Sequence, residues 1–433
     1  MNRIRQLWHS LEKVFDLPQL IKNVRDRRPY PVIPTASLHF TLVLGALLRV
    51  PSLLDLSLKT QGRGWQQLIG IKAFSDDALA YVLEQGVPKD WRNVLVAVNR
   101  RLKANKQFEA AKFGGLLVVS VDANEQFNSR SRCCAECCQR QIKMRNEQGP
   151  EEEVTEYYHR QVYAHLSGPG LNTILDVEPI RPGEDEAAAA LRMLGRMRRL
   201  YGVRFFDAVT VDAWYTTGPF IGAVEKLGWG VISVLKQERY EIYQEVTALA
   251  PHQTPVRWEQ AGRQIELREV RDLDFTDPQL GKMRVVVSDE QWIQTNVRGG
   301  KRVRTPKESH WRWLASRKLD GTPARTIHQA GHGRWGIENH AFNQRTQFYG
   351  LEHCARHEPV AILVWLLIRI LGLVLFEWFA NVHCKAVRLG KTTLKDLCAQ
   401  LWLALGRWEE LDVLWSGRLS TAAGCCPGPS TVL

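Results

Sequence analysis

An alternation of apolar strands with helices in residues 115–235 constrains the fold of this chain most strongly. Short apolar runs are typical of buried strands, and two alternating segments flank a Ser-Gly-Pro-Gly turn. The expected strands are residues 115–121, 157–166, 171–180, 206–211 and 231–235, and the expected helices are residues 184–201 and 216–227. This order of elements predicts an α/β sheet with helices packed on its faces.

The patterns on either side of this region differ from it. Residues before it have helical spacing of apolar side chains, whereas β-rich pieces and basic turns follow it, and further helices come last. We therefore expect a helical basic DNA-binding domain, the first part of an α/β core, a β-rich insertion, the second part of the core, and a helical C-terminal tail. Their expected bounds are residues 1–110, 111–236, 237–315, 316–385 and 386–433.

The chain is basic, with 433 residues and a net charge of +12. Residues 1–107 contain 17 Lys and Arg but 8 Asp and Glu, so +9 of this charge lies in the first quarter. A small, helical, basic module is typical of DNA-binding domains, and a solvated basic face is the alternative. Its candidate contacts with DNA are Arg25, Arg27 and Arg28.

A second basic segment lies in the expected insertion. Lys301, Arg302 and Arg304 follow a Gly-Gly turn, and Lys307 comes shortly after them. Clustered cations of this kind suit the phosphates of a DNA backbone. The alternative is a solvated basic loop.

The segment 360–380 is apolar and long enough to cross a membrane. Arg369 lies near its centre, where a charge would be costly in a bilayer, so we expect a buried core helix and no membrane partner. The first residues lack the apolar core of a signal peptide, and the nine cysteines are an odd number. We therefore expect a reducing, cytoplasmic location.

Two carboxylates follow apolar strands in the same way. Asp122 ends Val-Ser-Val-Asp, and Asp212 ends Thr-Val-Asp. Ligands collect at the carboxyl ends of strands in open α/β sheets, and a divalent cation would remove the repulsion between two neighbouring carboxylates. Capping of the following helix or loop is the alternative for each residue alone.

A third acid lies in an expected helix. Arg334 precedes Glu338 by four positions and Arg345 follows it by seven, so all three side chains share one helix face. This stripe suits a metal site beside a phosphodiester, with the acid on the metal and the arginines on phosphates. The alternative is an ordinary Arg–Glu pair on a solvated helix.

Four segments together give the chain a family resemblance, and they are VVSVDANEQFNS, EYYH, TVDAWYTTGPFI and RWGIENHAFNQRTQFYGLEH. The chain resembles the bacterial insertion-sequence transposases of the DDE class, in the cut-and-paste branch with a Tyr-Arg-Glu-Lys signature. The resemblance covers residues 115–353. It implies an RNase H-like catalytic core whose triad is Asp122, Asp212 and Glu338.

Within that signature, Arg334 matches the Arg, and Arg345 occupies the Lys position and keeps its charge. The Tyr position holds Gly331, so its role is absent or supplied by a neighbour such as His332. Trp335 is a candidate to stack on an unpaired base at a transposon end, with core packing as the alternative.

The resemblance also implies the reaction and its partners. Two Mg²⁺ or Mn²⁺ ions would promote in-line cleavage and joining of double-stranded DNA, at transposon ends and at a target. A homodimer is expected because two ends must be held together. No phosphate-binding loop occurs, so no nucleotide cofactor is expected. The alternatives are an RNase H-like nuclease that cuts without joining and a non-catalytic DNA-binding protein derived from a transposase.

A cysteine cluster is separate from these acids. Cys134 and Cys137 form a C-x₂-C pair, Cys133 lies beside them, and His159 and His165 follow on an expected strand. Because structural zinc takes four nitrogen or sulfur ligands, Cys133, Cys134, Cys137 and His159 are the candidate set. The resembling family often has His-Cys-x-x-Cys here, so Cys133 would replace that His. Buried thiols without metal are the alternative.

Overall fold

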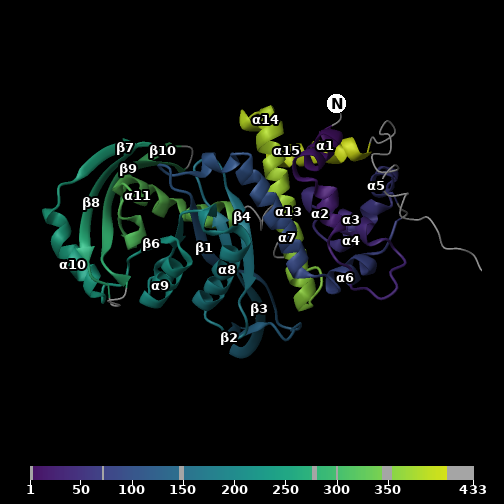
Figure 1. Cartoon of the computed structure of the whole chain (residues 1–433), viewed down its shortest axis with the longest axis horizontal. Helices are drawn as coiled ribbons and strands as arrows, with labels where there is room; N and C mark the ends of the chain where they lie inside the picture. Colours follow the sequence, from purple (N-terminus) through teal and green to yellow (C-terminus); the bar gives the residue numbers. More distant parts are fainter. Residues whose placement is uncertain are drawn as a thin grey trace, which may run out of the picture. The chain divides into compact units, whose positions relative to one another are not determined.

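The computed structural model describes residues 3–70, 73–145, 151–275, 280–298, 301–343 and 354–406 (Figure 1). The chain divides into two compact units. Unit 1 contains residues 1–101, 131–135 and 345–433, and unit 2 contains residues 102–130 and 136–344.

Unit 1 is built from helices. They are α1 (Arg3–Phe15), α2 (Leu17–Lys22), α3 (Thr35–Leu47), α4 (Leu53–Thr60), α5 (Arg63–Ile69), α6 (Asp76–Glu84), most of α7 (Pro88–Ala104), α13 (Pro359–His383), α14 (Lys385–Arg388) and α15 (Leu394–Gly406). Local signals set several of their ends. Pro18 lies in the first turn of α2, where a missing N–H costs nothing, and Ser75 accepts a hydrogen bond from the Ala78 N–H at 3.3 Å. The helical reading of the first hundred residues is confirmed.

Helix α13 is the buried core helix of unit 1 and packs against α3. Among the described residues it is the single helix long and apolar enough to cross a membrane, and 83% of its most apolar window is buried. Nη2 of the buried Arg369 donates to the carbonyls of Val50 at 3.2 Å and Pro51 at 2.5 Å. The expected core helix is confirmed, although it lies in unit 1 and not with residues 316–344 of the α/β unit.

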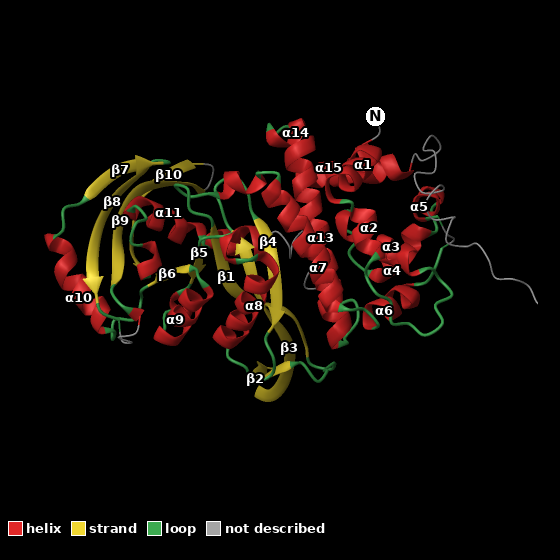
Figure 2. Ribbon diagram, in the orientation of Figure 1, coloured by secondary structure: helices red, strands yellow, loops and turns green. Residues whose placement is uncertain are grey.

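Unit 2 contains one large mixed sheet with helices around it (Figure 2). Its strands are β1 (Val118–Ser129), β2 (Cys138–Arg145), β3 (Glu151–Leu166), β4 (Thr173–Pro179), β5 (Ala208–Val211), β6 (Gly230–Val234), β7 (Val256–Gln260), β8 (Arg263–Leu273), β9 (Met283–Arg298) and β10 (Lys301–Ala315). Its helices are α8 (Glu186–Tyr201), α9 (Gly218–Leu227), α10 (Glu241–Leu249) and α11 (Ala324–Gly333), with the π-helix η7 (Ile337–Asn343). Short 3₁₀ turns are η1 (Gln107–Ala111), η2 (Val203–Phe205), η3 (Ala213–Tyr215), η4 (Ala250–His252) and η6 (Arg317–Leu319).

The first half of the sheet has the predicted order of elements. β3 pairs antiparallel with both β1 and β4. On the other side of β1, β5 pairs parallel with β1, and β6 pairs parallel with β5. Helices α8 and α9 make the connections to β5 and β6, as parallel neighbours require. The mixed α/β architecture predicted from the alternation is therefore confirmed.

The expectation that Asp122 ends a strand is wrong, because β1 continues to Ser129. Its parallel pairing with β5 covers Val118 to Ser120, but its antiparallel pairing with the long strand β3 extends much further. Asp122 therefore lies where the parallel part of the ladder ends while the strand itself goes on.

The β-rich insertion extends the same sheet. β6 pairs antiparallel with β10, and the order then runs β10, β9, β8 and β7. Residues 283–298 form one continuous strand, β9, which β10 pairs with from Arg284 to Arg298. Trp313 and Val286 of the insertion share a hydrophobic cluster with Val118 and Ala208 of the core strands.

Helix α11 lies in the curve of strands β8 to β10, which it contacts (Figure 2). The sequence predicts one helix that carries Arg334 and Glu338 on the same face. The described part is broken instead into α11 and the π-helix η7, which carries Glu338 near its start. A π-helix is held by i→i+5 hydrogen bonds, and short π-helical segments are frequent at functional sites.

Candidate active site

Asp122 and Asp212 occupy corresponding positions on neighbouring strands. Ser120 pairs with Thr210 in the parallel ladder, and their hydroxyl oxygens lie 2.9 Å apart. Asp122 lies two positions further along β1, Asp212 lies one position beyond the end of β5, and the negative charge of Asp212 acts on Asp122. The structure therefore brings together two acids separated by 90 positions in the sequence.

Each carboxylate uses one oxygen locally. Oδ1 of Asp212 accepts from the Trp214 N–H at 2.8 Å and caps the turn η3, which is the alternative role considered for this residue. Oδ1 of Asp122 accepts from the Ala123 N–H at 2.9 Å. Since each carboxylate has a second oxygen, local capping and ligand binding are compatible.

Arg334 links the third acid to the first. Its Nη1 lies 3.2 Å from Oδ2 of Asp122, and its Nη2 lies 3.0 Å from Oε1 of Glu338. The pair with Glu338 is the i,i+4 contact expected on one helix face, but Arg334 is buried and not solvated. Its guanidinium thus holds Glu338 next to the strand that carries Asp122.

Asp122 has a strongly perturbed acidity. Burial raises its pKa to about 7, the charge of Arg334 opposes this, and the negative charges of Asp212 and Glu186 add to it. A carboxylate poised near neutrality beside a second carboxylate is typical of a functional site. A cation placed between these acids would lower the pKa of Asp122 by relieving both burial and repulsion.

Glu186 is a fourth acid that the sequence did not single out. It lies in the first turn of α8, accepts from the hydroxyl of Tyr215 at 2.6 Å, and forms an ion pair with Arg160. Burial and this carboxylate raise the pKa of Tyr215. In the sequence, Glu186 has the pattern of an ordinary acid at a helix N-terminus, so no local signal marked it.

The carboxylates have the right chemistry for a hard divalent cation such as Mg²⁺, which prefers oxygen ligands. Among the described residues, the oxygens of Asp122, Asp212 and Glu338 do not all come within 4.8 Å of one another. The guanidinium of Arg334 supplies the positive charge between Asp122 and Glu338 in this arrangement. The donor set fits Mg²⁺, and these residues would hold it.

The presence of Gly331 at the Tyr position of the family signature has a steric explanation. A Cβ on Gly331 would lie 2.5 Å from Cε3 of Trp313, so the indole fills the space that a side chain would need. Neighbouring His332 is directed to Glu290, with its Nε2 2.5 Å from Oε1 of that residue. His332 is therefore engaged with the insertion strand β9 and not with the three acids.

Trp335 belongs to an aromatic cluster that borders a cavity. Its ring lies 4.7 Å from that of Trp311 and 5.1 Å from that of His332. A cavity of about 940 Å³ is lined by these residues together with Trp292, Gly336 and Asn339. Both readings of Trp335 keep support, since it packs on neighbours and also borders a space large enough for a base.

Three basic candidates of the insertion are exposed. Arg302 and Arg304 are exposed on β10, and so is Lys307. The backbone of Lys301 pairs with Arg298 at the start of the same hairpin. Arg345 lies outside the described residues.

The three N-terminal candidates are not equivalent. Arg28 is buried and bound to Asp26 at 2.7 Å, and Arg25 is exposed but paired with Asp90 at 2.8 Å. Burial raises the pKa of Asp26, but hydrogen bonds from Arg28 and Thr35 outweigh it and lower that pKa to about 2. Arg27 is exposed. The burial of Arg28 assigns it to holding unit 1 together and gives no support to a DNA contact.

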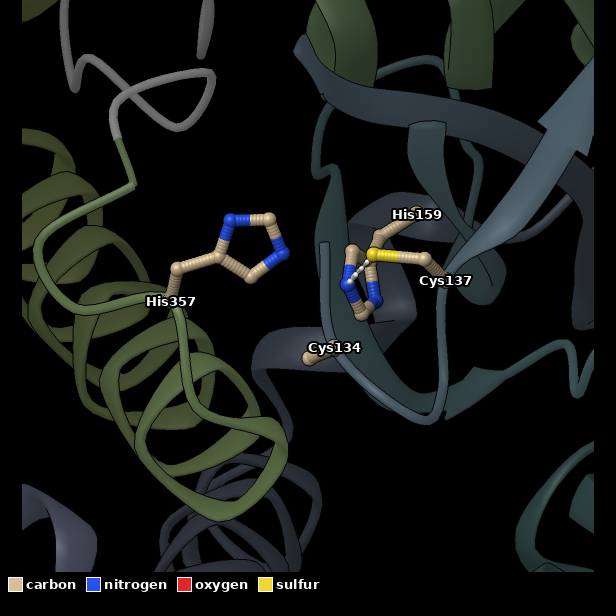
Figure 3. A group of neighbouring side chains, drawn as sticks. All are labelled: Cys134, Cys137, His159 and His357. Carbon is tan, nitrogen blue, oxygen red and sulfur yellow. Dashed lines mark hydrogen bonds between the residues drawn. The ribbon is translucent and has the colours of Figure 1, made fainter. Parts of the chain in front are cut away.

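The cysteine cluster contributes to both units. In unit 2, Sγ of Cys137 lies 3.2 Å from Nε2 of His159 (Figure 3). In unit 1, the thiol of Cys134 and a ring nitrogen of His357 lie within 4.8 Å of each other. Cys133 is exposed and is not in either pair, and His165 bonds to Ser167 at 2.8 Å. Cys137 and His159 are thus possible metal ligands within unit 2, and Cys134 and His357 are possible metal ligands within unit 1, of which the sequence missed His357.

A second group of possible metal ligands lies within unit 2. Glu290 on β9 and His328 and His332 on α11 place one ligand atom each within 4.8 Å of the others. Burial raises the pKa of Glu290, but hydrogen bonds from the two histidines outweigh it and hold that pKa well below its usual value. In the sequence, the three residues carry no recognised spacing, because the carboxylate is 38 positions before the first histidine.

The sequence matches none of the protein-family models and none of the curated proteins with which it was compared.

Proposed function

We propose that this chain is a DNA transposase that binds terminal inverted repeats and catalyses metal-dependent strand cleavage and strand transfer. The observation that carries the proposal is the double contact of Arg334 with Asp122 and Glu338, residues 212 positions apart in the first case and four in the second. It joins two of the three acids that the family resemblance selects, and the third, Asp212, is near enough for its charge to act on Asp122.

The fold supports the same proposal. The three antiparallel strands β1, β3 and β4 followed by the parallel strands β5 and β6 agree with the RNase H-like core that the resemblance implies. Asp122 and Asp212 are on the central pair of this set, and Glu338 follows the insertion. This arrangement supports the proposed role of the three acids.

In this proposal Asp122, Asp212 and Glu338 bind two Mg²⁺ or Mn²⁺ ions, which when bound activate a water or a DNA 3′-hydroxyl and stabilise the leaving oxygen. Arg334 orients Asp122 and Glu338 and offers its charge to a phosphate. Trp335, at the edge of the cavity, stacks on an unpaired base. Arg302 and Arg304 contact the DNA backbone from the exposed hairpin.

The partners follow from the reaction. Double-stranded DNA is bound as transposon ends and as target, and a homodimer holds the two ends together. Arg27 is the exposed candidate for backbone contacts in unit 1. A structural zinc ion is part of the proposal, with Cys134, Cys137 and His159 as ligands because a C-x₂-C pair can bind one ion.

The test uses the full chain and DNA from both flanks of its gene, which should contain paired inverted repeats. We expect cleavage and joining with Mg²⁺ or Mn²⁺, lost in Asp122→Asn, Asp212→Asn and Glu338→Gln. Asp274→Asn is the matched control, since Asp274 is exposed and pairs with Lys282 on the surface. Cleavage without joining would identify a nuclease, and metal-independent DNA binding without cleavage would identify a non-catalytic protein.

A further inference from the structure

Three side chains in unit 2 converge on one point away from the proposed triad. His328 and His332 are four positions apart on α11, so they share one face of that helix. Nε2 of His328 lies 3.0 Å and Nε2 of His332 lies 2.5 Å from the same oxygen, Oε1 of Glu290 on β9. The two imidazole rings are 4.5 Å apart at their centres.

The geometry is that of a metal ligand set. Ligand atoms about 2.1 Å from a tetrahedral zinc ion are about 3.4 Å from one another. Nε2 of His328 and Nε2 of His332 lie 3.0 Å and 2.5 Å from Oε1 of Glu290, so each would move less than about 1 Å to admit the ion. Two imidazoles and one carboxylate are also the donors that transition-metal dications select over Mg²⁺.

Surrounding groups fix the carboxylate in place. Oε2 of Glu290 accepts from Arg263 at 3.0 Å, and the Ser288 hydroxyl donates to Oε1 at 3.0 Å. Glu290 and His328 are both buried, so their positions are determined by packing. Outer contacts of this kind orient ligands in metal sites.

One coordination position would remain accessible. Glu290, His328 and His332 all line the cavity of about 940 Å³, together with Trp311 and Trp335. Three protein ligands that face a cavity leave a fourth position for water or another small ligand.

We propose that Glu290, His328 and His332 bind one transition-metal dication of the zinc class, with its fourth position open to the cavity. This ion fastens α11 to the insertion strand β9. Because Arg334 directly follows α11, the ion also fixes the start of the segment that leads to Glu338. Nothing in this site requires the chain to be a transposase, so the two proposals can fail separately.

The probe is Co²⁺ added to the full-length, metal-free chain, read by visible absorption and by metal content. Thiolate-to-cobalt charge transfer reports the cysteine cluster, whereas Glu290, His328 and His332 give ligand-field bands without it. In a Cys134→Ser/Cys137→Ser background we expect one Co²⁺ per chain. His332→Asn and Glu290→Gln should each weaken its binding at least tenfold.

His310→Asn is the matched control, because His310 is an exposed histidine on the neighbouring strand β10 and pairs with Asp289. It should retain the ion. Thermal unfolding with and without metal covers the case of a poorly folded variant, since the ion should raise the melting temperature of the His310 variant but not of the His332 variant. Equal cobalt content in His332→Asn and its parent, or no cobalt in the double-serine background, would overturn the proposal.

Discussion

Arg334 lies 3.2 Å from Asp122 although the two residues are 212 positions apart, and the same guanidinium lies 3.0 Å from Glu338. A single buried cation therefore fixes a strand residue of the sheet relative to the π-helix that follows α11. Arg is suited to this because its planar group can donate to two carboxylates at once, whereas the ammonium of Lys is a compact point charge.

Replacing Arg334 should separate its geometric role from its charge. We expect Arg334→Lys and Arg334→Ala to reduce strand cleavage by about a hundredfold, the usual scale for losing one group that positions or stabilises charge at a reaction centre. The measurement is single-turnover cleavage of end DNA, with DNA binding determined in parallel. Full cleavage by Arg334→Lys would contradict the bridging role.

Asp122 should make stability depend on pH in metal-free protein. Its folded pKa of about 7 lies above the unfolded value of 3.8. The unfolded chain therefore loses this proton first as pH rises, and the free energy of unfolding falls between about pH 4 and pH 7. In EDTA, Asp122→Asn should be about 1–3 kcal/mol more stable than the parent at pH 8 and little different at pH 4. Urea titrations at both pH values check this, and equal differences at both would refute it.

Gly331 should tolerate no side chain. A methyl group there would lie 2.5 Å from the ring of Trp313, so we expect Gly331→Ala to cost about 1–3 kcal/mol of stability. Gly331→Tyr, which restores the family signature, should cost more. Gly195→Ala is the control, because Gly195 is inside helix α8 with no atom near the added methyl group, and it should gain up to about 1 kcal/mol.

The cysteines should differ in zinc binding. We expect Cys134→Ser and Cys137→Ser to lose a zinc ion, and Cys133→Ser to retain it, because Cys133 is exposed and outside the ligand pairs. Metal content of the purified chains provides the measurement. A loss of zinc in Cys133→Ser would restore the ligand set expected from the sequence, in which Cys133 is a ligand.

Arg27 and Arg28 should have opposite phenotypes. Arg27→Ala should weaken DNA binding and reduce the salt-dependence slope by about one, as expected for one phosphate contact. Arg28→Ala should instead destabilise the chain, because it removes a buried guanidinium and leaves the partly buried Asp26 without its ion-pair partner. Binding isotherms at several salt concentrations and thermal unfolding distinguish the two.

Local pattern was sufficient for much of the fold. The alternation at residues 115–235 predicted β1, β3, β4, β5, β6, α8 and α9, since hydrophobic period and turn residues are local properties, but it missed the strand β2. It could not predict that β1 continues past Asp122, because the long antiparallel partner β3 determines that length. Nor could it predict that β10 joins β6, a pairing between residues about 80 positions apart.

Only the part of the candidate site that lies in recognisable local sequence patterns was predicted. Asp122, Asp212 and Glu338 have local signals in the strands and the helix that contain them. Glu186, His357 and the group around Glu290 do not, because their neighbours come from distant segments. The burial of Arg28 was equally hidden, since a basic residue in a basic run gives no sign of which carboxylate it will meet.

The pairing of β6 with β10 affects how the chain folds during synthesis. Until residue 315 is made, β6 has one open edge, with backbone groups ready to pair with another chain. The partner strand arrives only after the whole β7–β9 segment, so the nascent protein carries an exposed, apolar strand edge for most of that interval. We therefore expect chaperone binding and aggregation to be greatest at this stage, before β10 pairs with β6.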